Sequence, residues 1–161
     1  MVLVVAACGT SDNRTATGAA RGVTDTSIKI GTHTDLSGQL ALWGVPLVNR
    51  MRMRFEELAA AGGVHGRTVD FVVEDSQYQV PVAVTAVNKL LHADKIFAML
   101  GSMGTPHNNA TFSTMFEANV PCLFPLSAAR SMYEPHHPLK FSYFFSYQNP
   151  VSGGMAYMLE Q

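Results

Sequence analysis

The chain has 161 residues, of which 47% are hydrophobic and 14% are charged, and its formal net charge is −1 at pH 7. This length and hydrophobic content suffice for a domain with its own core and argue against a disordered chain. The near-neutral charge, without a cluster of Lys and Arg, argues against nucleic acid as a partner, because phosphate binding requires a concentrated positive surface.

Residues 1–8 resemble the end of a bacterial lipoprotein signal. The apolar run 2–7 ends in small residues at Cys8, and a polar segment follows. In such signals the cysteine thiol is the lipid attachment site, which would tether the chain to a membrane by its N-terminus. The alternative interpretation is an ordinary first β-strand with a buried cysteine. Residues 9–22 have no core pattern and are expected to be a linker.

The next segment predicts a strand over residues 28–31 and then an amphipathic helix over residues 46–61. Apolar side chains recur in the helix at spacings of three and four residues, at Val48, Met51, Phe55 and Leu58. Pro46 suits a first helical turn, where its missing N–H would have no partner, and the glycines at 62–63 suit the end of the helix.

The same alternation of strand and helix continues to the end of the chain. We expect strands over 68–74, 96–100, 121–124 and 141–145, helices over about 80–91 and 106–118, and a last helix capped by Asn149-Pro150. Strands that alternate with helices pair in parallel through right-handed crossovers. The sequence therefore predicts an α/β fold with an open, mostly parallel sheet that has helices on both faces.

Ligands of open α/β sheets bind beyond the carboxyl ends of the strands. This rule selects four loops, which we expect to share one edge of the sheet: 32–43, 75–79, 101–105 and 126–130. Trp43, the only tryptophan, lies in the first loop, where it could stack on a ligand or fill the core.

The third loop offers the clearest chemistry, because it ends a buried strand and opens a helix. Its hydroxyl groups and free backbone N–H groups would suit a carboxylate. The alternative is that Ser102 or Thr105 only caps the following helix. The fourth loop adds the hydroxyl of Ser127 and open backbone amides, although it could also be an ordinary turn.

Other chemistries lack a pattern in the sequence. The six histidines have no zinc-ligand spacing, and we expect them to be structural or solvated. No G-x-S-x-G elbow is present, and Cys122, on an apolar run, is expected to be a small core residue. We therefore expect a protein that is not an enzyme and has no metal or cofactor.

Four motifs resemble the opening of the leucine/isoleucine/valine-binding family of type I periplasmic solute-binding proteins. They are Ile28–Gly31, Asp35–Gly38, Trp43–Gly44 and Ala61–Arg67, and the resemblance continues to Gln161. It implies that residues 23–145 are the first lobe of a two-lobed domain. Residues 146–161 would be the crossover and the first helix of a second lobe, so that the chain would hold half of a cleft.

The resemblance also implies a set of solute-binding residues. Trp43 would form an aromatic wall, and Trp43 and Tyr78 together would suit a flat ring of the solute. Tyr78 and Gly104 stand where some family members have a disulfide. The carboxylate-holding turn would be Met103, Gly104 and Thr105, with Ser102 close by, and the second contact loop would be Leu126, Ser127, Ala128 and Ala129. Ala128 stands where amino-acid binders commonly have a threonine hydroxyl, which leaves room for amides, other amino acids or aromatic carboxylates.

The implied function is that of the solute-binding component of an ABC importer, which captures a carboxylate-bearing solute and delivers it to permease subunits. Such a protein would lie in the periplasm or on the outer face of the bacterial membrane. Two alternatives remain from the sequence. One is a ligand-sensing regulatory receptor of the same fold, responding to an amide or amino acid, and the other is an α/β enzyme.

Overall fold

The computed structural model describes residues 20–160. Cys8, with the predicted lipoprotein signal, and most of the predicted linker lie outside the described residues. The elements are β1 (Ser27–Thr34), α1 (Ala41–Ala60), β2 (Thr68–Asp75), α2 (Val80–His92), β3 (Ala98–Leu100), α3 (Thr105–Glu117), β4 (Cys122–Leu123), a 3-10 turn (Arg130–Met132), β5 (Lys140–Phe141) and α4 (Gln148–Leu159).

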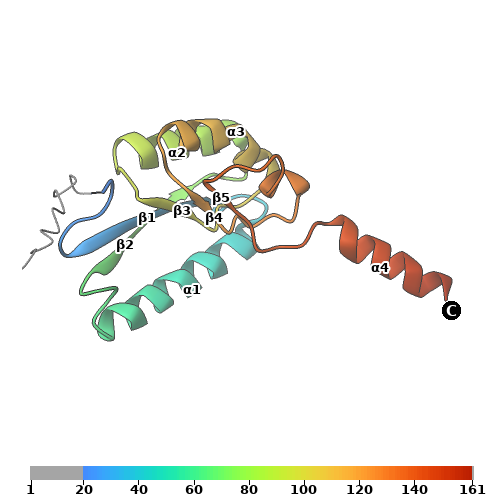
Figure 1. Cartoon of the computed structure of the whole chain (residues 1–161), viewed down its shortest axis with the longest axis horizontal. Coiled ribbons are helices and arrows are strands. Elements are labelled where there is room, and N and C mark those ends of the chain that lie inside the picture. Colours follow the sequence, from blue (N-terminus) through green and yellow to red (C-terminus); the bar gives the residue numbers. More distant parts are fainter. Residues whose placement is uncertain (1–19, 161) are drawn as a thin grey trace, which may run out of the picture.

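The five strands form one sheet in the order β2-β1-β3-β4-β5, and every neighbouring pair is parallel. Helix α1 lies on one face, and α2 and α3 lie on the other (Figure 1). This arrangement confirms the predicted fold class. Because all strands run in the same direction, their carboxyl ends and the loops that follow meet at one edge.

The main hydrophobic core lies between the sheet and the pair α2 and α3. Its buried members are Val87, Leu90, Leu91, Ile96, Met99, Phe112, Met115, Val120, Cys122 and Met132. Cys122 is a buried core residue, as the sequence predicts, and this burial raises the pKa of its thiol to about 11. The thiol is therefore neutral and packs as a small apolar group.

Helix α1 packs on the opposite face through the predicted apolar stripe. Val48 is buried, and the Phe55 ring meets the Phe71 ring of β2 edge to face, with centroids 5.1 Å apart. The helix packs mainly on β2, and a cavity lies on this face between α1, Leu100 of β3 and Phe124 after β4. The two faces of the sheet are therefore unequally covered in the described residues.

The structure corrects the start of α1, which begins at Ala41 and not at Pro46. A Cβ on Gly44 would lie 1.8 Å from the Asp35 carbonyl oxygen, so only glycine permits the first turn to pack against the preceding loop. Trp43 is consequently a helical residue and not a loop residue. Pro46 lies in the second turn of α1. Because proline has no N–H, the carbonyl of Leu42, four residues earlier, has no helical partner, and Leu42 is an exposed residue.

The last strands are shorter than the sequence predicts. Pairing between β4 and β5 ends with the hydrogen bond from Phe124 N–H to the Phe141 carbonyl, because the next donor in this alternating series, Leu126 N–H, bonds to the Ser102 carbonyl instead. The predicted strand over 141–145 is therefore wrong beyond Phe141. Instead, the chain turns so that Tyr147 N–H donates to the Ala128 carbonyl at 2.9 Å.

The two ends of the described chain differ. At the N-terminal end the Arg21 guanidinium donates to the carbonyls of Leu91 and Ile96, so this residue docks on the body of the fold. At the other end α4 extends away from the sheet, with every described side chain exposed (Figure 1). Within residues 20–160, none of the helices has both the length and the hydropathy that a membrane span requires.

Candidate functional site

A cavity of about 490 Å³ lies at the carboxyl edge of the sheet. Its lining residues come from the segments after β1, β2, β3, β4 and β5, and they are Leu40, Trp43, Tyr78, Met103, Gly104, Thr105, Leu126 and Tyr147. All except Leu40 and Tyr147 are among the ten residues that the sequence proposes for solute binding. We call this cavity the solute cleft.

The segment after β1 is ordered by the buried carboxylate of Asp35. Its Oδ1 accepts from Gly38 N–H and its Oδ2 accepts from Leu40 N–H, both at 2.6 Å. These bonds fix the turn that leads into α1, and they place Leu40 and Trp43 on the cleft. Trp43 is 65% exposed, so it does not fill the core. Its contact with a solute remains a prediction.

The segment after β2 is tied to this turn by a second carboxylate. Asp75 accepts hydrogen bonds from Leu36 N–H at 2.9 Å, from Gln77 N–H at 2.8 Å and from the Ser37 hydroxyl. Partial burial acts to raise the pKa of Asp75, but the bonds from the Ser37 hydroxyl and the backbone amides lower it overall. The charged carboxylate thus holds the first two loops together.

Loops three and four continue the pairing of the sheet beyond its strands. Met103 N–H donates to the His33 carbonyl at 3.1 Å, and Leu126 N–H donates to the Ser102 carbonyl at 2.9 Å. Gly104 has φ 97°, which favours glycine, and a Cβ there would lie 2.2 Å from Nδ1 of His107. This backbone lets the chain turn sharply from Met103 into α3.

A pair of hydroxyl groups joins these two loops. The Thr105 and Ser127 oxygens are 2.7 Å apart, and the Ser127 oxygen also accepts from Ala129 N–H at 3.2 Å. Helix α3 has no side-chain cap, so the interpretation that Thr105 only caps its own helix is wrong. Since one hydroxyl donates to the other, one hydroxyl hydrogen remains for a ligand.

Backbone donors lie beside this hydroxyl pair. The first helical bond at this end of α3 runs from Asn108 N–H to the Gly104 carbonyl, so the N–H groups of Thr105 and His107 have no helical partner. Together, the hydroxyl hydrogen and the backbone N–H groups provide donors suited to an anion.

Four of the proposed binding residues, Ser102, Ser127, Ala128 and Ala129, do not line the cleft. Ser102 is 0% exposed, and its hydroxyl donates to Oδ1 of Asn108 at 2.5 Å. Ala129 packs against the core, and Ala128 contributes the carbonyl that holds Tyr147. Ser127 reaches the site through Thr105. These residues support the loops that form the cleft.

Sequence reasoning missed Leu40, Tyr147 and Asn108. The side-chain amide of Asn108 donates to the carbonyls of Gly104 at 2.8 Å and Ser102 at 3.1 Å, which fixes the turn before α3. Tyr147 follows the fifth strand, and the rule that selects loops at the carboxyl edge would have found it if it had been applied to that strand too. We find no sequence signal for Asn108.

Two histidines that are far apart in the sequence meet behind the cleft. The rings of His33 and His107 have centroids 6.5 Å apart, and the Tyr78 ring packs on His107 at 4.5 Å. Burial lowers the pKa of His33 to about 3, with a further contribution from His107. In the part of the chain that the structure describes, all four ring nitrogens of these two histidines are buried without a hydrogen-bond partner, and there is no group of three or more metal-ligating side chains.

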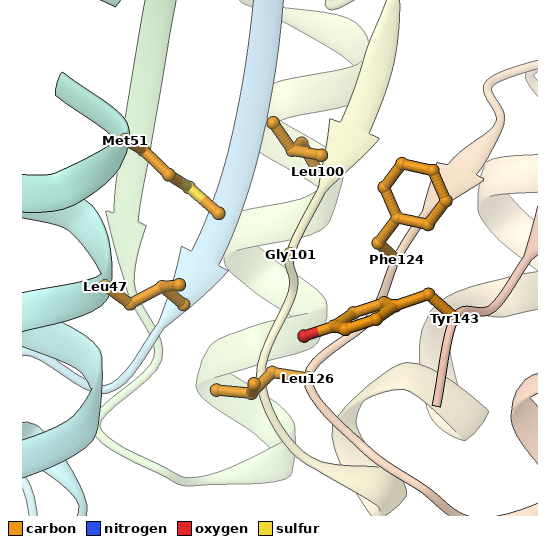
Figure 2. A pocket seen from close by; sticks show the side chains of 7 residues that line it. All are labelled: Leu47, Met51, Leu100, Gly101, Phe124, Leu126 and Tyr143. Carbon is orange, nitrogen blue, oxygen red and sulfur yellow. The ribbon is translucent and has the colours of Figure 1, made fainter. Parts of the chain in front are cut away.

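A second cavity, of about 410 Å³, lies on the α1 side of the sheet (Figure 2). It is lined by Leu47, Met51, Leu100, Gly101, Phe124, Leu126 and Tyr143. Figure 2 shows the two α1 side chains pointing across the cavity toward Phe124 and Tyr143. We call it the apolar cavity. It shares only Leu126 with the solute cleft.

Comparisons with known proteins give the family and the fold. A family described as periplasmic binding protein matches residues 27–161. No curated protein matches the sequence. A solved structure of a possible leucine/isoleucine/valine-binding protein from Rhodopirellula baltica has a TM-score of 0.78 at 19% identity, over 90% of this chain and 38% of that protein.

Two further solved structures are similar. A substrate-binding periplasmic protein from Ralstonia solanacearum has a TM-score of 0.77 at 27% identity, over 83% of this chain and 38% of that protein. A fatty acid ABC transporter substrate-binding protein from Thermomonospora curvata has a TM-score of 0.76 at 23% identity, over 89% and 36%. The chain thus spans well under half the length of these structures. The family match over residues 27–161 shows that this chain belongs to the periplasmic binding protein family, as its opening motifs predict.

Proposed function

We propose that this chain is part of the solute-binding component of an ABC importer, and that the solute cleft holds the carboxylate of a small organic solute. The protein acts outside the inner membrane, by capture and delivery to permease subunits and without chemical conversion of the solute. Lipid attachment at Cys8 would keep it near its permease.

The observation that carries this proposal is the convergence of distant loops on one cleft. Trp43, Tyr78 and Thr105 belong to three separate segments, yet all line the same cavity at the carboxyl edge. Hydroxyl and backbone donors gather there around Thr105 and Ser127. A concave, mostly apolar site with a few convergent polar groups is typical of a small-molecule site.

The family relationship supports a carboxylate as the common feature of the solute. The names of the Rhodopirellula and Thermomonospora proteins refer to branched-chain amino acids and to a fatty acid, which differ in shape but share that group. Capture would proceed by a shift of population from an open to a closed form as a second lobe covers the solute.

The direct test is a thermal-shift screen of the complete gene product against amino acids, amides, aromatic acids and fatty acids. A solute that binds only the native state raises its melting temperature. We expect at least one carboxylate to do so, and calorimetry should then give a saturable signal. A panel without any stabilising carboxylate would contradict the proposal.

A genetic test separates transport from sensing. Deletion of the gene should abolish uptake of the stabilising solute, and the intact gene should restore it. If uptake continues while solute-dependent gene expression is lost, the protein is a sensor and the transport role is wrong.

A further inference from the structure

We infer that a buried water molecule bridges the rings of His33 and His107, and that this bridge fixes Tyr78 in the wall of the solute cleft. The two histidines would be positioning residues for the site of the proposed function, on which that role rests. Both lie inside this lobe and are already buried there.

The two histidines are buried without polar partners. His33 and His107 are 0% and 1% exposed, and within residues 20–160 none of their four ring nitrogens has a hydrogen-bond partner. Burial lowers the pKa of His33 to about 3, so its ring is neutral at pH 7 and carries one donor and one acceptor. Unpaired buried polar groups are costly and rare in native proteins, so these nitrogens need partners.

The distance between the rings selects water as the shared partner. Two imidazole rings joined by a direct N–H···N bond have their centroids about 5 Å apart. The centroids of His33 and His107 are 6.5 Å apart. One water molecule between the rings spans this distance with two bonds of about 2.8–2.9 Å, because it accepts from one nitrogen and donates to the other.

Other partners for the rings are already engaged or too few. Glu74 stands opposite His33 in the paired strands, but its carboxylate bonds to Lys89. A metal ion held by imidazole needs further protein ligands. Within the described residues no His, Cys, Asp or Glu joins the pair in a group that could hold a metal ion. Water therefore suits the site better than a cation does.

The pair contacts two segments of the cleft. The His107 ring packs on the Tyr78 ring at 4.5 Å, and its Nδ1 lies so close to Gly104 that a Cβ there would be 2.2 Å away. Tyr78 has φ 52°, a conformation that a residue other than glycine keeps only when its surroundings hold it. Since Tyr78 and Gly104 both line the cleft, a fixed His107 ring fixes part of its wall. His33 acts through His107.

Crystallography of the complete gene product tests the bridge. We expect an ordered water molecule within about 3.2 Å of one nitrogen of each ring. A direct bond between the rings, a metal ion between them, or rings without a shared water molecule would each overturn the inference. This measurement uses no solute, so its failure leaves the proposed function standing, and a failed solute screen leaves the bridge standing.

Amide hydrogen exchange tests the positioning role. Gln79 N–H donates to the Ser76 carbonyl at 2.8 Å and closes the turn that carries Tyr78, so its exchange rate reports the order of that turn. In His33→Leu, which cannot bond to water, we expect this amide to exchange at least tenfold faster. In His33→Gln, whose amide supplies a donor and an acceptor in place of the ring, the rate should stay within threefold.

A control separates positioning from a general loss of stability. Val120 is a fully buried core residue before β4, at the end of the sheet opposite the cleft. Val120→Ala removes core packing without touching the histidines and should change the Gln79 rate less than twofold. An equal increase in Val120→Ala and His33→Leu, no increase in His33→Leu, or the same increase in His33→Gln would overturn the positioning role. If His33→Leu fails to fold, the crystallographic test still decides the bridge.

Discussion

The solute cleft and the apolar cavity are of similar size and share one wall, but their linings differ. The cleft combines aromatic rings with hydroxyl and backbone donors from loops at the carboxyl edge. The apolar cavity is lined by aliphatic and aromatic side chains of α1, β3 and the segments after β4 and β5. Volume alone therefore does not identify the site, whereas convergent polar groups do.

The supports of the two cavities differ as well. Behind the cleft lie buried polar residues, among them Asp35, His33 and Asn108, whose hydrogen bonds or ring contacts set the loops. The apolar cavity lies between α1, β3 and the segments after β4 and β5, and its lining is apolar apart from the Tyr143 hydroxyl. We expect changes at the cleft to affect solute affinity, and changes at the apolar cavity to affect stability at most.

The largest effect is expected for Gly44→Ala, which places a Cβ against the Asp35 backbone. The first turn of α1 must shift, which should lower the free energy of unfolding by about 2 kcal/mol and displace Trp43. Urea denaturation and calorimetry measure the two effects. Gly153→Ala in α4, where a Cβ meets nothing, is the control and should be neutral or slightly stabilising.

Removal of the hydroxyl in Thr105→Val comes next. A hydrogen bond to a charged group is worth about 1.5–3 kcal/mol, so affinity for the carboxylate should fall about 10- to 100-fold. Thr85→Val is the matched control, because its hydroxyl bonds only to the Pro81 carbonyl on α2. Equal affinities of Thr105→Val and the original protein would exclude Thr105 as an anchor.

A smaller effect should separate the cavities directly. Tyr78 in the cleft and Phe124 in the apolar cavity both have positive φ, of 52° and 54°, so leucine meets the same backbone constraint at each. Tyr78→Leu should weaken binding about tenfold, because a ring contact with the solute is lost. Phe124→Leu should change it less than twofold. The reverse order would assign the solute to the apolar cavity.

The smallest effect concerns pH. The pKa of His33 is about 3 in the folded protein and about 6.5 in the unfolded chain. Below pH 6.5 the unfolded chain takes up a proton at His33 that the folded protein does not, so the free energy of unfolding is highest above pH 6.5 and decreases as the pH falls toward 3. Between pH 7 and pH 6 this one group should lower the free energy of unfolding by about 0.7 kcal/mol. Urea denaturation at both pH values measures it.

A control isolates this titration. His33→Gln should lose that part of the pH dependence. An unchanged pH dependence in His33→Gln would mean that other groups cause it.

The sequence by itself determined the fold class and the edge at which the cleft forms. Alternating strands and amphipathic helices admit a parallel sheet, and the carboxyl ends of parallel strands share one edge. The apolar spacing on α1 also predicted its packed face correctly, since periodicity reports which side of an element is buried.

Only the tertiary structure decided which side chains meet. The start of α1 depends on the approach of Gly44 to Asp35, and the hydroxyl pair of Thr105 and Ser127 depends on the register between β3 and β4. The burial of Ser102, which removes it from the cleft, could not be read from the local sequence. The physical reason is that local patterns set the orientation of each element, whereas contacts between loops depend on how several elements pack together.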